Sequence, residues 1–286
     1  MDTTTAIDLH AAALRRKNRS PRTIEFYAYW LHALEAFTNS ADLESITLAH
    51  LRAWSDLLAL KQLSPGSIRG AAMTAKVFFK WCTREGLITS NPAERLELPQ
   101  RPRRIPTALS TSDVLTVINC VQQHSRNPIR DTALIVFMVE TGVRRSELIT
   151  LTPDDVHVPE GYAVVVGKGN KQRWVFFGEA TTQTVTKWLQ IRPGQTHNLW
   201  GIKESGLRAI LRRIATKTGL KLHPHLFRRT SATLRAASGA NATDLQLQFG
   251  WESVEMANSY VQRAQLQQRA AAQAPLRGVL LPGATA

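Results

Sequence analysis

The chain has 286 residues, of which 43% are hydrophobic and 20% are charged. This length suits two hydrophobic cores, and the composition argues against a disordered chain. The longest apolar run, Ala133 to Val139, is far too short to span a bilayer. Thirty-six lysines and arginines against 22 acidic residues leave a net charge of +14. A protein this basic is expected to bind a polyanion, and we favour nucleic acid over acidic protein partners.

The positive charge is spread along the chain. Residues 1–104 hold 15 basic against 10 acidic residues, and residues 105–286 hold 21 against 12. The two cysteines, Cys82 and Cys120, are far apart and lack metal-ligand spacing, so we expect reduced, packed thiols. The N-terminus does not have the pattern of a signal peptide. These features predict a cytoplasmic protein.

The first hundred residues have the pattern of helices. Ser20-Pro21 and Ser64-Pro65 each combine an N-cap residue with a proline suited to the first helical turn. Apolar residues then recur at helical spacing. The predicted helices cover about residues 6–16, 23–37, 48–58 and 68–82, and Gly86 ends the last of them.

Residues 98–106 combine three prolines with several basic side chains, a composition that cannot continue a helix. We therefore predict a helical DNA-binding domain at 1–98, a linker at 99–107 and a second domain at 108–286. The basic side chains of the linker are candidates for DNA backbone contacts, although a merely solvated linker is the alternative. They are Arg101, Arg103 and Arg104.

The second domain is mixed. A helix begins at Ser110 or Ser112, a buried helix covers Ile129 to Glu140, and a further helix starts at Arg145. The period then changes to that of strands at 156–158, 162–166 and 172–177, with a hairpin loop between the last two. From Lys203 onward the pattern is helical again. The tail after residue 265 is rich in alanine and glutamine and ends in an apolar patch at 279–281.

Four short segments in chain order carry residues that could act on a phosphodiester. They read TGVRRSEL at 141–148, GKGNKQR at 167–173, HLFR at 225–228, and GW at 250–251 followed by Tyr260. Together they resemble the signature boxes of the tyrosine recombinase family, and the hairpin segment resembles its Xer-type members. The resemblance extends over the whole chain. Each box alone is weak, but four in the correct order with the correct inner spacings are strong.

The resemblance implies a fold that is mainly α with a small β-sheet, in which a SAM-like core-binding domain precedes the catalytic domain. It implies a site-specific recombinase that cleaves and rejoins DNA through a 3′-phosphotyrosine intermediate and a Holliday junction, with no metal and no cofactor. Six positions match the catalytic residues of the family. They are Arg144, Lys168, His225, Arg228, Trp251 and the nucleophile Tyr260, with Glu147 in a supporting role.

These residue types suit the chemistry. Attack on a phosphodiester loads negative charge onto two non-bridging oxygens, and the guanidiniums of Arg144 and Arg228 offer paired donors that stay charged. Lys168 is the expected general acid for the leaving 5′ oxygen. His225 is expected to hydrogen-bond the phosphate or to move the proton of the nucleophile. Trp251, where most members have histidine, can donate a hydrogen bond but cannot titrate.

Some assignments stay open within these segments. Lys171 competes with Lys168, His223 rivals His225, and Arg229 leaves it ambiguous which guanidinium faces the phosphate. Lys171, Arg173 and Arg229 are also candidate DNA contacts.

The expected partner is double-stranded DNA carrying a specific recombination site, bound by a homo-tetramer on two duplexes or by a hetero-tetramer with a related recombinase. No membrane partner is expected, and the place of action is the bacterial nucleoid. The apolar patch of the tail is a candidate contact to a neighbouring protomer. The alternatives are a type IB topoisomerase and a DNA-binding protein without catalysis.

Overall fold

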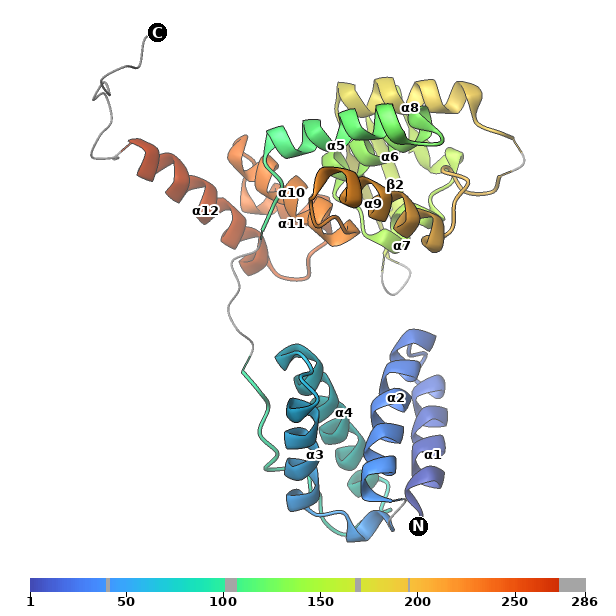
Figure 1. Ribbon diagram of the computed structural model, residues 1–286, viewed down its shortest axis with the longest axis vertical. Helices are drawn as coiled ribbons and strands as arrows, with labels where there is room; N and C mark the ends of the chain where they lie inside the picture. Colours follow the sequence, from blue (N-terminus) through green and yellow to red (C-terminus); the bar gives the residue numbers. More distant parts are fainter. Residues whose placement is uncertain (40–41, 101–106, 168–170, 195, 273–286) are drawn as a thin grey trace. The chain divides into compact units, whose positions relative to one another are not determined.

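The structure is a computed structural model that describes residues 1–39, 42–100, 107–167, 171–194 and 196–272 (Figure 1). The chain divides into two compact units, residues 1–104 and 105–286. Both cysteines are buried free thiols. The predicted fold class is confirmed, because helices dominate and the described strands form one small sheet.

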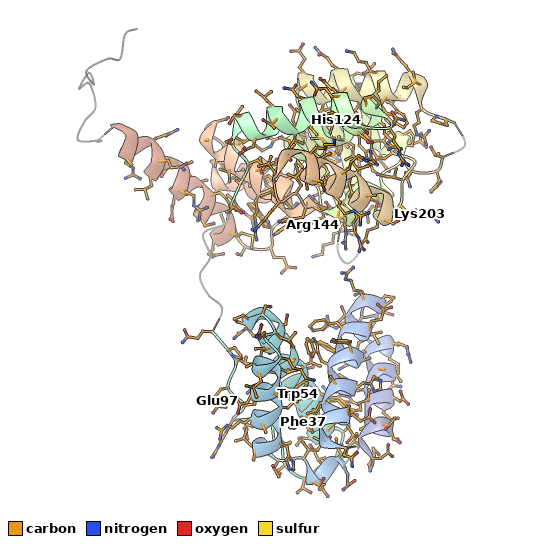
Figure 2. The ribbon with its side chains drawn as sticks, viewed as in Figure 1. Phe37, Trp54, Glu97, His124, Arg144 and Lys203 are labelled. Atoms are coloured by element: carbon orange, nitrogen blue, oxygen red, sulfur yellow. The ribbon has the colours of Figure 1, made fainter. Side chains whose placement is uncertain are left out.

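The first unit is helical. Its elements are α1 (Thr3–Arg16), α2 (Pro21–Thr38), a 3-10 turn (Leu43–Ser45), α3 (Leu48–Leu60) and α4 (Pro65–Arg84). The side chains of Ser20 and Ser64 accept hydrogen bonds from the third residue beyond them, as the Ser-Pro pairs predict. Trp54 lies among these helices with 1% of its surface exposed, and Phe78 and Phe79 are fully buried (Figure 2). The unit is therefore built around an aromatic core.

The described residues of the second unit begin with five helices, of which α6 is the most buried. They are α5 (Thr111–His124), α6 (Pro128–Thr141), α7 (Arg145–Thr150), α8 (Glu179–Ile191) and α9 (Glu204–Thr218). Helix α6 packs against α5, α8 and α10 (Pro224–Ala237), which explains why its sequence is apolar on nearly every side. Gly142 ends α6 in the left-handed conformation, with φ of 61°. The main chain then leads directly to Arg144.

A three-stranded antiparallel sheet follows, in the order β1 (Val156–His157), β2 (Tyr162–Val166) and β3 (Gln172–Phe176). The register pairs Val165 with Arg173 and Val166 with Gln172, so β2 and β3 form the predicted hairpin. Residues 168–170 at its tip, which include Lys168, lie outside the described residues. At its base, the Gly167 N–H donates to the Lys171 carbonyl at 2.8 Å.

Helices α10, α11 (Ala242–Phe249) and α12 (Val254–Ala272) form a separate small core. Helix α12 packs on both α10 and α11 (Figure 1). Tyr260 is on α12 and packs against this core. The apolar patch at 279–281 lies outside the described residues.

The structure settles which serine begins α5 and adds one helix that the sequence does not predict. Ser110, not Ser112, caps α5, because its hydroxyl accepts from the Asp113 N–H and the Asp113 carboxylate accepts from the Ser110 N–H. Helix α8 was not predicted. Its first turn is satisfied from another element, since the Glu140 carboxylate accepts from the N–H groups of Gly178 and Thr181.

Candidate active site

Arg144 stands at the N-cap of α7, just beyond the end of α6. Its N–H donates to Oε2 of Glu147 at 2.6 Å, and its Nη1 donates to Oε1 of the same carboxylate at 2.9 Å. Its Nη2 donates to the Gly250 carbonyl at 3.0 Å, which connects α7 to the end of α11. The side chain keeps 38% of its surface exposed. One part of the guanidinium is thus held by the protein while the rest faces solvent.

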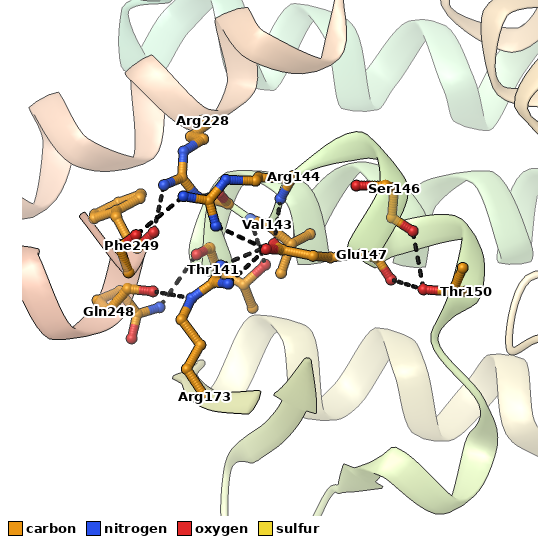
Figure 3. Close-up of polar contacts among 12 residues, drawn as sticks. Thr141, Val143, Arg144, Ser146, Glu147, Thr150, Arg173, Arg228, Gln248 and Phe249 are labelled. Carbon is orange, nitrogen blue, oxygen red and sulfur yellow. Dashed lines mark hydrogen bonds and ion pairs between the residues drawn. The ribbon is translucent and has the colours of Figure 1, made fainter. Parts of the chain in front are cut away.

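Glu147 is the buried anion of the site, with 1% of its surface exposed. Burial alone would raise its pKa, but the hydrogen bonds and the charge of Arg173, with the bonds from Arg144, lower the pKa to about 2. The carboxylate is therefore ionised at neutral pH. The expectation that Glu147 orients a neighbouring basic side chain fits its bonds to both arginines (Figure 3).

Arg228, on α10, is a nearly buried cation, 5% exposed. It donates to the Gly142 carbonyl at 2.8 Å and to the Phe249 carbonyl. Its guanidinium carbon lies 5.1 Å from the centre of the Phe249 ring and 5.7 Å from that of Trp251. Burial, reinforced by the charges of Arg144 and Arg173, lowers its pKa to about 9, so it stays protonated at neutral pH.

Figure 3 shows the guanidiniums of Arg144 and Arg228 next to each other, one from the start of α7 and one from α10. Two cations this close repel, and the pKa of Arg228 records that repulsion. A phosphate oxygen between them would relieve it. The geometry is that of an anion site with two guanidinium donors.

Tyr260 lies at the end of an aromatic stack. Its ring is 5.4 Å from that of Trp251 with 9° between the planes, and Trp251 is 4.8 Å from Phe249 with 17° between the planes. Burial raises the pKa of the Tyr260 phenol, and the charges of Arg229, Arg263 and Arg228 oppose that change. The phenol is therefore protonated at neutral pH.

The two histidines before Arg228 have different surroundings. His223 is the N-cap of α10, and its Nδ1 accepts from the Leu226 N–H at 3.1 Å. His225 lies on the first helical turn, where partial desolvation of its ring, together with the charges of Arg229 and Arg228, lowers its pKa. Nδ1 of His223 is therefore occupied by the helix N-terminus, whereas the His225 ring makes no hydrogen bond to another described residue.

The remaining predicted positions have different surroundings. Lys171 is exposed at the base of the hairpin, and Arg229 is half-buried. Arg173 is not directed to solvent, because its guanidinium binds Glu147. Arg101, Arg103 and Arg104 lie outside the described residues, as Lys168 does. A Cβ added to Gly167, next to Lys168, would lie 3.4 Å from Oε1 of Glu147 and 3.7 Å from Nη1 of Arg144. The end of β2 therefore lies beside Arg144 and Glu147.

Gln248 is a residue of this region that the sequence reasoning missed. It is 5% exposed, and its amide bonds the Thr141 carbonyl at 3.2 Å and both the N–H and the carbonyl of Phe176 at 3.0 Å. These bonds join the end of α6, strand β3 and α11. The available signal was an amide that alternates with Leu245, Leu247 and Phe249 at the end of α11, directly before the Phe249-Gly250-Trp251 turn.

Among the described residues, no group of three or more His, Cys, Asp or Glu side chains is placed to hold a metal ion. A search of the same residues finds no helix both long and apolar enough for a membrane span.

Fold and site together define a protein of the phage integrase family, and the chain belongs to it. The model described as "Phage integrase family" matches residues 108–267, and that described as "Phage integrase, N-terminal SAM-like domain" matches residues 7–88. The chain is similar to tyrosine recombinase XerC of Mycobacterium sp. (strain KMS), with 36% identity over 181 residues. That match covers 60% of each chain, so it spans less than two thirds of the relative.

Other comparisons extend further along the chain. Tyrosine recombinase XerC of Alcanivorax borkumensis is 29% identical over 255 residues, which cover 84% of this chain and 82% of the relative. These relatives confirm the resemblance to Xer-type tyrosine recombinases.

Two solved structures share the fold at lower sequence identity. One is a lambda integrase (75–356) dimer bound to a COC′ core site, with a TM-score of 0.75, 18% identity and coverage of 90% of this chain and 97% of that one. The other is XerH bound to a palindromic difH substrate, with a TM-score of 0.74, 19% identity and coverage of 92% and 84%.

Proposed function

We propose that this chain is a site-specific DNA recombinase that cleaves and rejoins DNA through Tyr260. One observation carries the proposal: the phenol of Tyr260 lies within the electrostatic reach of Arg228, which in turn stands beside Arg144. A nucleophile and a two-guanidinium anion site thus meet at one place, although they come from three helices far apart in sequence.

In the first step, the Tyr260 oxygen attacks the phosphorus and the bond to the 5′ oxygen breaks. The product is a 3′-phosphotyrosine and a free 5′-hydroxyl, so the number of phosphoester bonds is unchanged. Arg144 and Arg228 donate to the two non-bridging oxygens, where charge accumulates. Because the donors are already held by Glu147 and by main-chain carbonyls, little reorganisation is needed.

Two proton transfers complete that step. His225 is neutral at neutral pH, since its pKa is lowered, and it accepts the phenol proton or bonds a phosphate oxygen. Lys168 gives a proton to the leaving 5′ oxygen, a role supported by the position of the neighbouring Gly167 beside Arg144. Trp251 donates its indole N–H and supports the tyrosine ring by stacking. The transesterification then proceeds without a metal.

In the second step, the 5′-hydroxyl of a partner strand attacks the phosphotyrosine and releases Tyr260. Exchange of one pair of strands produces a Holliday junction, and exchange of the second pair resolves it. Such an exchange needs four protomers on two duplexes, as a homo-tetramer or with a related recombinase. The relatives named as tyrosine recombinases, and the similar solved structures bound to a COC′ core site or to a difH substrate, support double-stranded DNA as the partner.

Residues 1–98 would grip the duplex, the basic linker at 99–107 would follow its backbone, and residues 108–286 would carry the chemistry. Lys171 and Arg229, at the edge of the site, would contact phosphates. The net charge of +14 supplies the electrostatic attraction. The place of action that follows is the nucleoid of the bacterial cytoplasm.

A trapping assay tests this proposal. DNA fragments selected for binding would carry a bridging 5′-phosphorothiolate, whose sulfur leaves readily and does not attack back. Wild type should form a covalent complex that survives boiling in detergent, and Tyr260→Phe should form none. Tyr162→Phe is the matched control, because Tyr162 lies in the sheet and packs on His157 and Trp174. Equal trapping by wild type and Tyr260→Phe would remove Tyr260 as the nucleophile.

A further inference from the structure

The carboxylate of Glu147 accepts four hydrogen bonds from two arginines (Figure 3). Oε1 accepts from Nη1 of Arg144 at 2.9 Å and from Nη1 of Arg173 at 2.5 Å. Oε2 accepts from the Arg144 N–H at 2.6 Å and from Nη2 of Arg173 at 2.8 Å. A carboxylate has about four lone-pair sites, so this one is saturated. The Arg173 pair is the bidentate one.

Arg173 lies on β3, yet its side chain contacts two other elements. Its Nη atoms bind Glu147 in α7, and its Nε donates to the Gln248 carbonyl at 3.3 Å near the end of α11. A Cβ added to Gly250 would lie only 2.7 Å from Cδ of Arg173. Only glycine therefore fits where the main chain turns toward Trp251, and Arg173 fills the space behind that turn.

This arrangement is difficult to reconcile with a DNA contact, the role that the sequence predicts for Arg173. The side chain is 13% exposed, whereas that of Arg144 is 38% exposed. All three guanidinium nitrogens of Arg173 already donate to protein acceptors. The Arg144 guanidinium is the more accessible of the two.

We propose that Arg173 is a positioning residue for the cleavage reaction. It holds the carboxylate of Glu147 in place, and that carboxylate in turn orients the Arg144 guanidinium. Arg144 and Arg173 bind one carboxylate and Arg228 stands beside Arg144, so these four side chains carry two net positive charges. Without Arg173, the buried carboxylate would have Arg144 as its one cation partner in this cluster. Arg144 would then turn inward to satisfy Glu147 and lose its orientation toward a phosphate.

The role also connects the hairpin to the arginines. Arg173 is two residues from Lys171 and belongs to the strand that supports the tip with Lys168. The Arg173–Glu147 pair therefore fixes the distance between the base of the hairpin and the anion site. The inference rests on the proposed function, because cleavage is its main readout.

The decisive variant is Arg173→Lys, which keeps the charge but loses the bidentate geometry. At saturating phosphorothiolate DNA, we expect the single-turnover rate of covalent complex formation to fall about 100-fold, as for a misplacement of a catalytic group by about 1 Å. The Kd for DNA should stay within about threefold, and the slope of log K against log salt should not change. Arg130→Lys is the matched control, since Arg130 pairs with the fully buried Asp131 at the other end of α6 and should keep the wild-type rate.

A DNA contact would behave differently. Loss of one phosphate contact in Arg173→Gln would weaken binding and reduce the salt slope by about 1, with an unchanged rate at saturating DNA. That result, or a wild-type rate in Arg173→Lys, would overturn the proposal.

A second variant guards against misfolding. Glu147→Gln combined with Arg173→Gln removes both charges of the pair and leaves two amides, so no unpaired buried charge results. If Arg173 acts through Glu147, the double variant should be no slower than the slower single variant. Rate losses that multiply would show two independent roles and contradict the proposal. A wild type that forms no covalent complex would overturn the proposed function instead; coupling of the two positions in thermal unfolding would still decide whether Arg173 holds Glu147.

Discussion

The two units of this chain bury different side chains. Among the described residues of the first unit, the buried polar side chains are those of Thr3, His10 and Thr74, and its interior is mostly aromatic and aliphatic. The second unit buries ionised groups at its active-site end, Glu147 and Arg228. Buried charges lose hydration and seldom add net stability. The interior of the first unit is thus formed by packing alone, whereas the second unit also keeps ionised groups in place, as the proposed reaction requires.

The largest expected effect is on catalysis, from Arg228→Gln. The change removes a buried cation beside the nucleophile, and we expect cleavage to slow by about 10³-fold, the upper range for one preorganised donor. The measurement is the single-turnover rate of trapping, with thermal unfolding to confirm the fold. Arg52→Gln, which breaks the surface pair Arg52–Glu97 of the first unit, should change the rate less than twofold. A rate for Arg228→Gln within tenfold of wild type would contradict the assignment.

Next in size is the effect of carboxylate removal on stability. Glu147→Ala leaves Arg144 and Arg173 without their buried anion, and we expect a loss of about 3–5 kcal/mol in the free energy of unfolding. Glu97→Ala, at an exposed pair, should cause no measurable change. Urea titration at neutral pH measures both variants. Equal losses of unfolding free energy in Glu147→Ala and Glu97→Ala would contradict the contrast between the units.

The two units should also respond to acid in different windows. Burial lowers the pKa of His10 from 6.5 to about 4, so the unfolded state binds the proton first and the first unit loses stability as pH falls from 6.5 to 4. The pKa of Glu147 falls from 4.5 to about 2, so its contribution is complete above pH 4.5 and is lost between 4.5 and 2. Once its pH window has been crossed, each of the two pKa shifts lowers the free energy of unfolding by about 3 kcal/mol.

Hydrogen exchange followed by mass spectrometry at several pH values can assign these losses to each unit. His10→Phe should flatten the upper window in residues 1–100 and leave the second unit unchanged. Faster hydrogen exchange in both units of that variant between pH 6.5 and 4 would contradict the prediction that the two units lose stability in different pH windows.

The smallest expected effect comes from a pair of glycines with positive φ. Gly86, φ 72°, has nothing within 4 Å of an added Cβ, so Gly86→Ala should cost about 1–2 kcal/mol for the left-handed backbone. Gly142, φ 61°, would place its Cβ 2.2 Å from Cε1 of Phe249. Gly142→Ala should cost more than Gly86→Ala and slow cleavage, because Phe249 supports Trp251 and Tyr260. Equal free energies of unfolding for the two variants would show that the Phe249 ring moves away from the added Cβ without cost, which would contradict this prediction.

The sequence predicts most of this architecture, because helix starts and helix ends depend on residues close to them in the chain. Ser20 and Ser64 cap helices as their Ser-Pro pairs predict, and Gly142 ends α6 shortly after the apolar run Ala133 to Val139. Helix α8 has weaker local signals. Its N-terminus depends on the Glu140 carboxylate, a partner about 40 residues away in sequence that no local pattern could reveal.

The site shows the same division. The boxes name Arg144, Arg228 and Tyr260, but spacing alone does not show that Trp251 and Phe249 form a stack under the tyrosine. Arg173 had the pattern of a surface cation in a basic hairpin. Its partner Glu147 lies 26 residues earlier, so its burial becomes visible only when the strand is placed beside α7.

The most direct test of the central claim is to identify the amino acid joined to DNA. Wild-type protein would be trapped on phosphorothiolate DNA, digested with protease and nuclease, and analysed by mass spectrometry for the nucleotide-bearing peptide. We predict a 3′-phosphodiester on Tyr260, one of four tyrosines in the chain. A nucleotide on Tyr27, Tyr29, Tyr162 or any serine would contradict it.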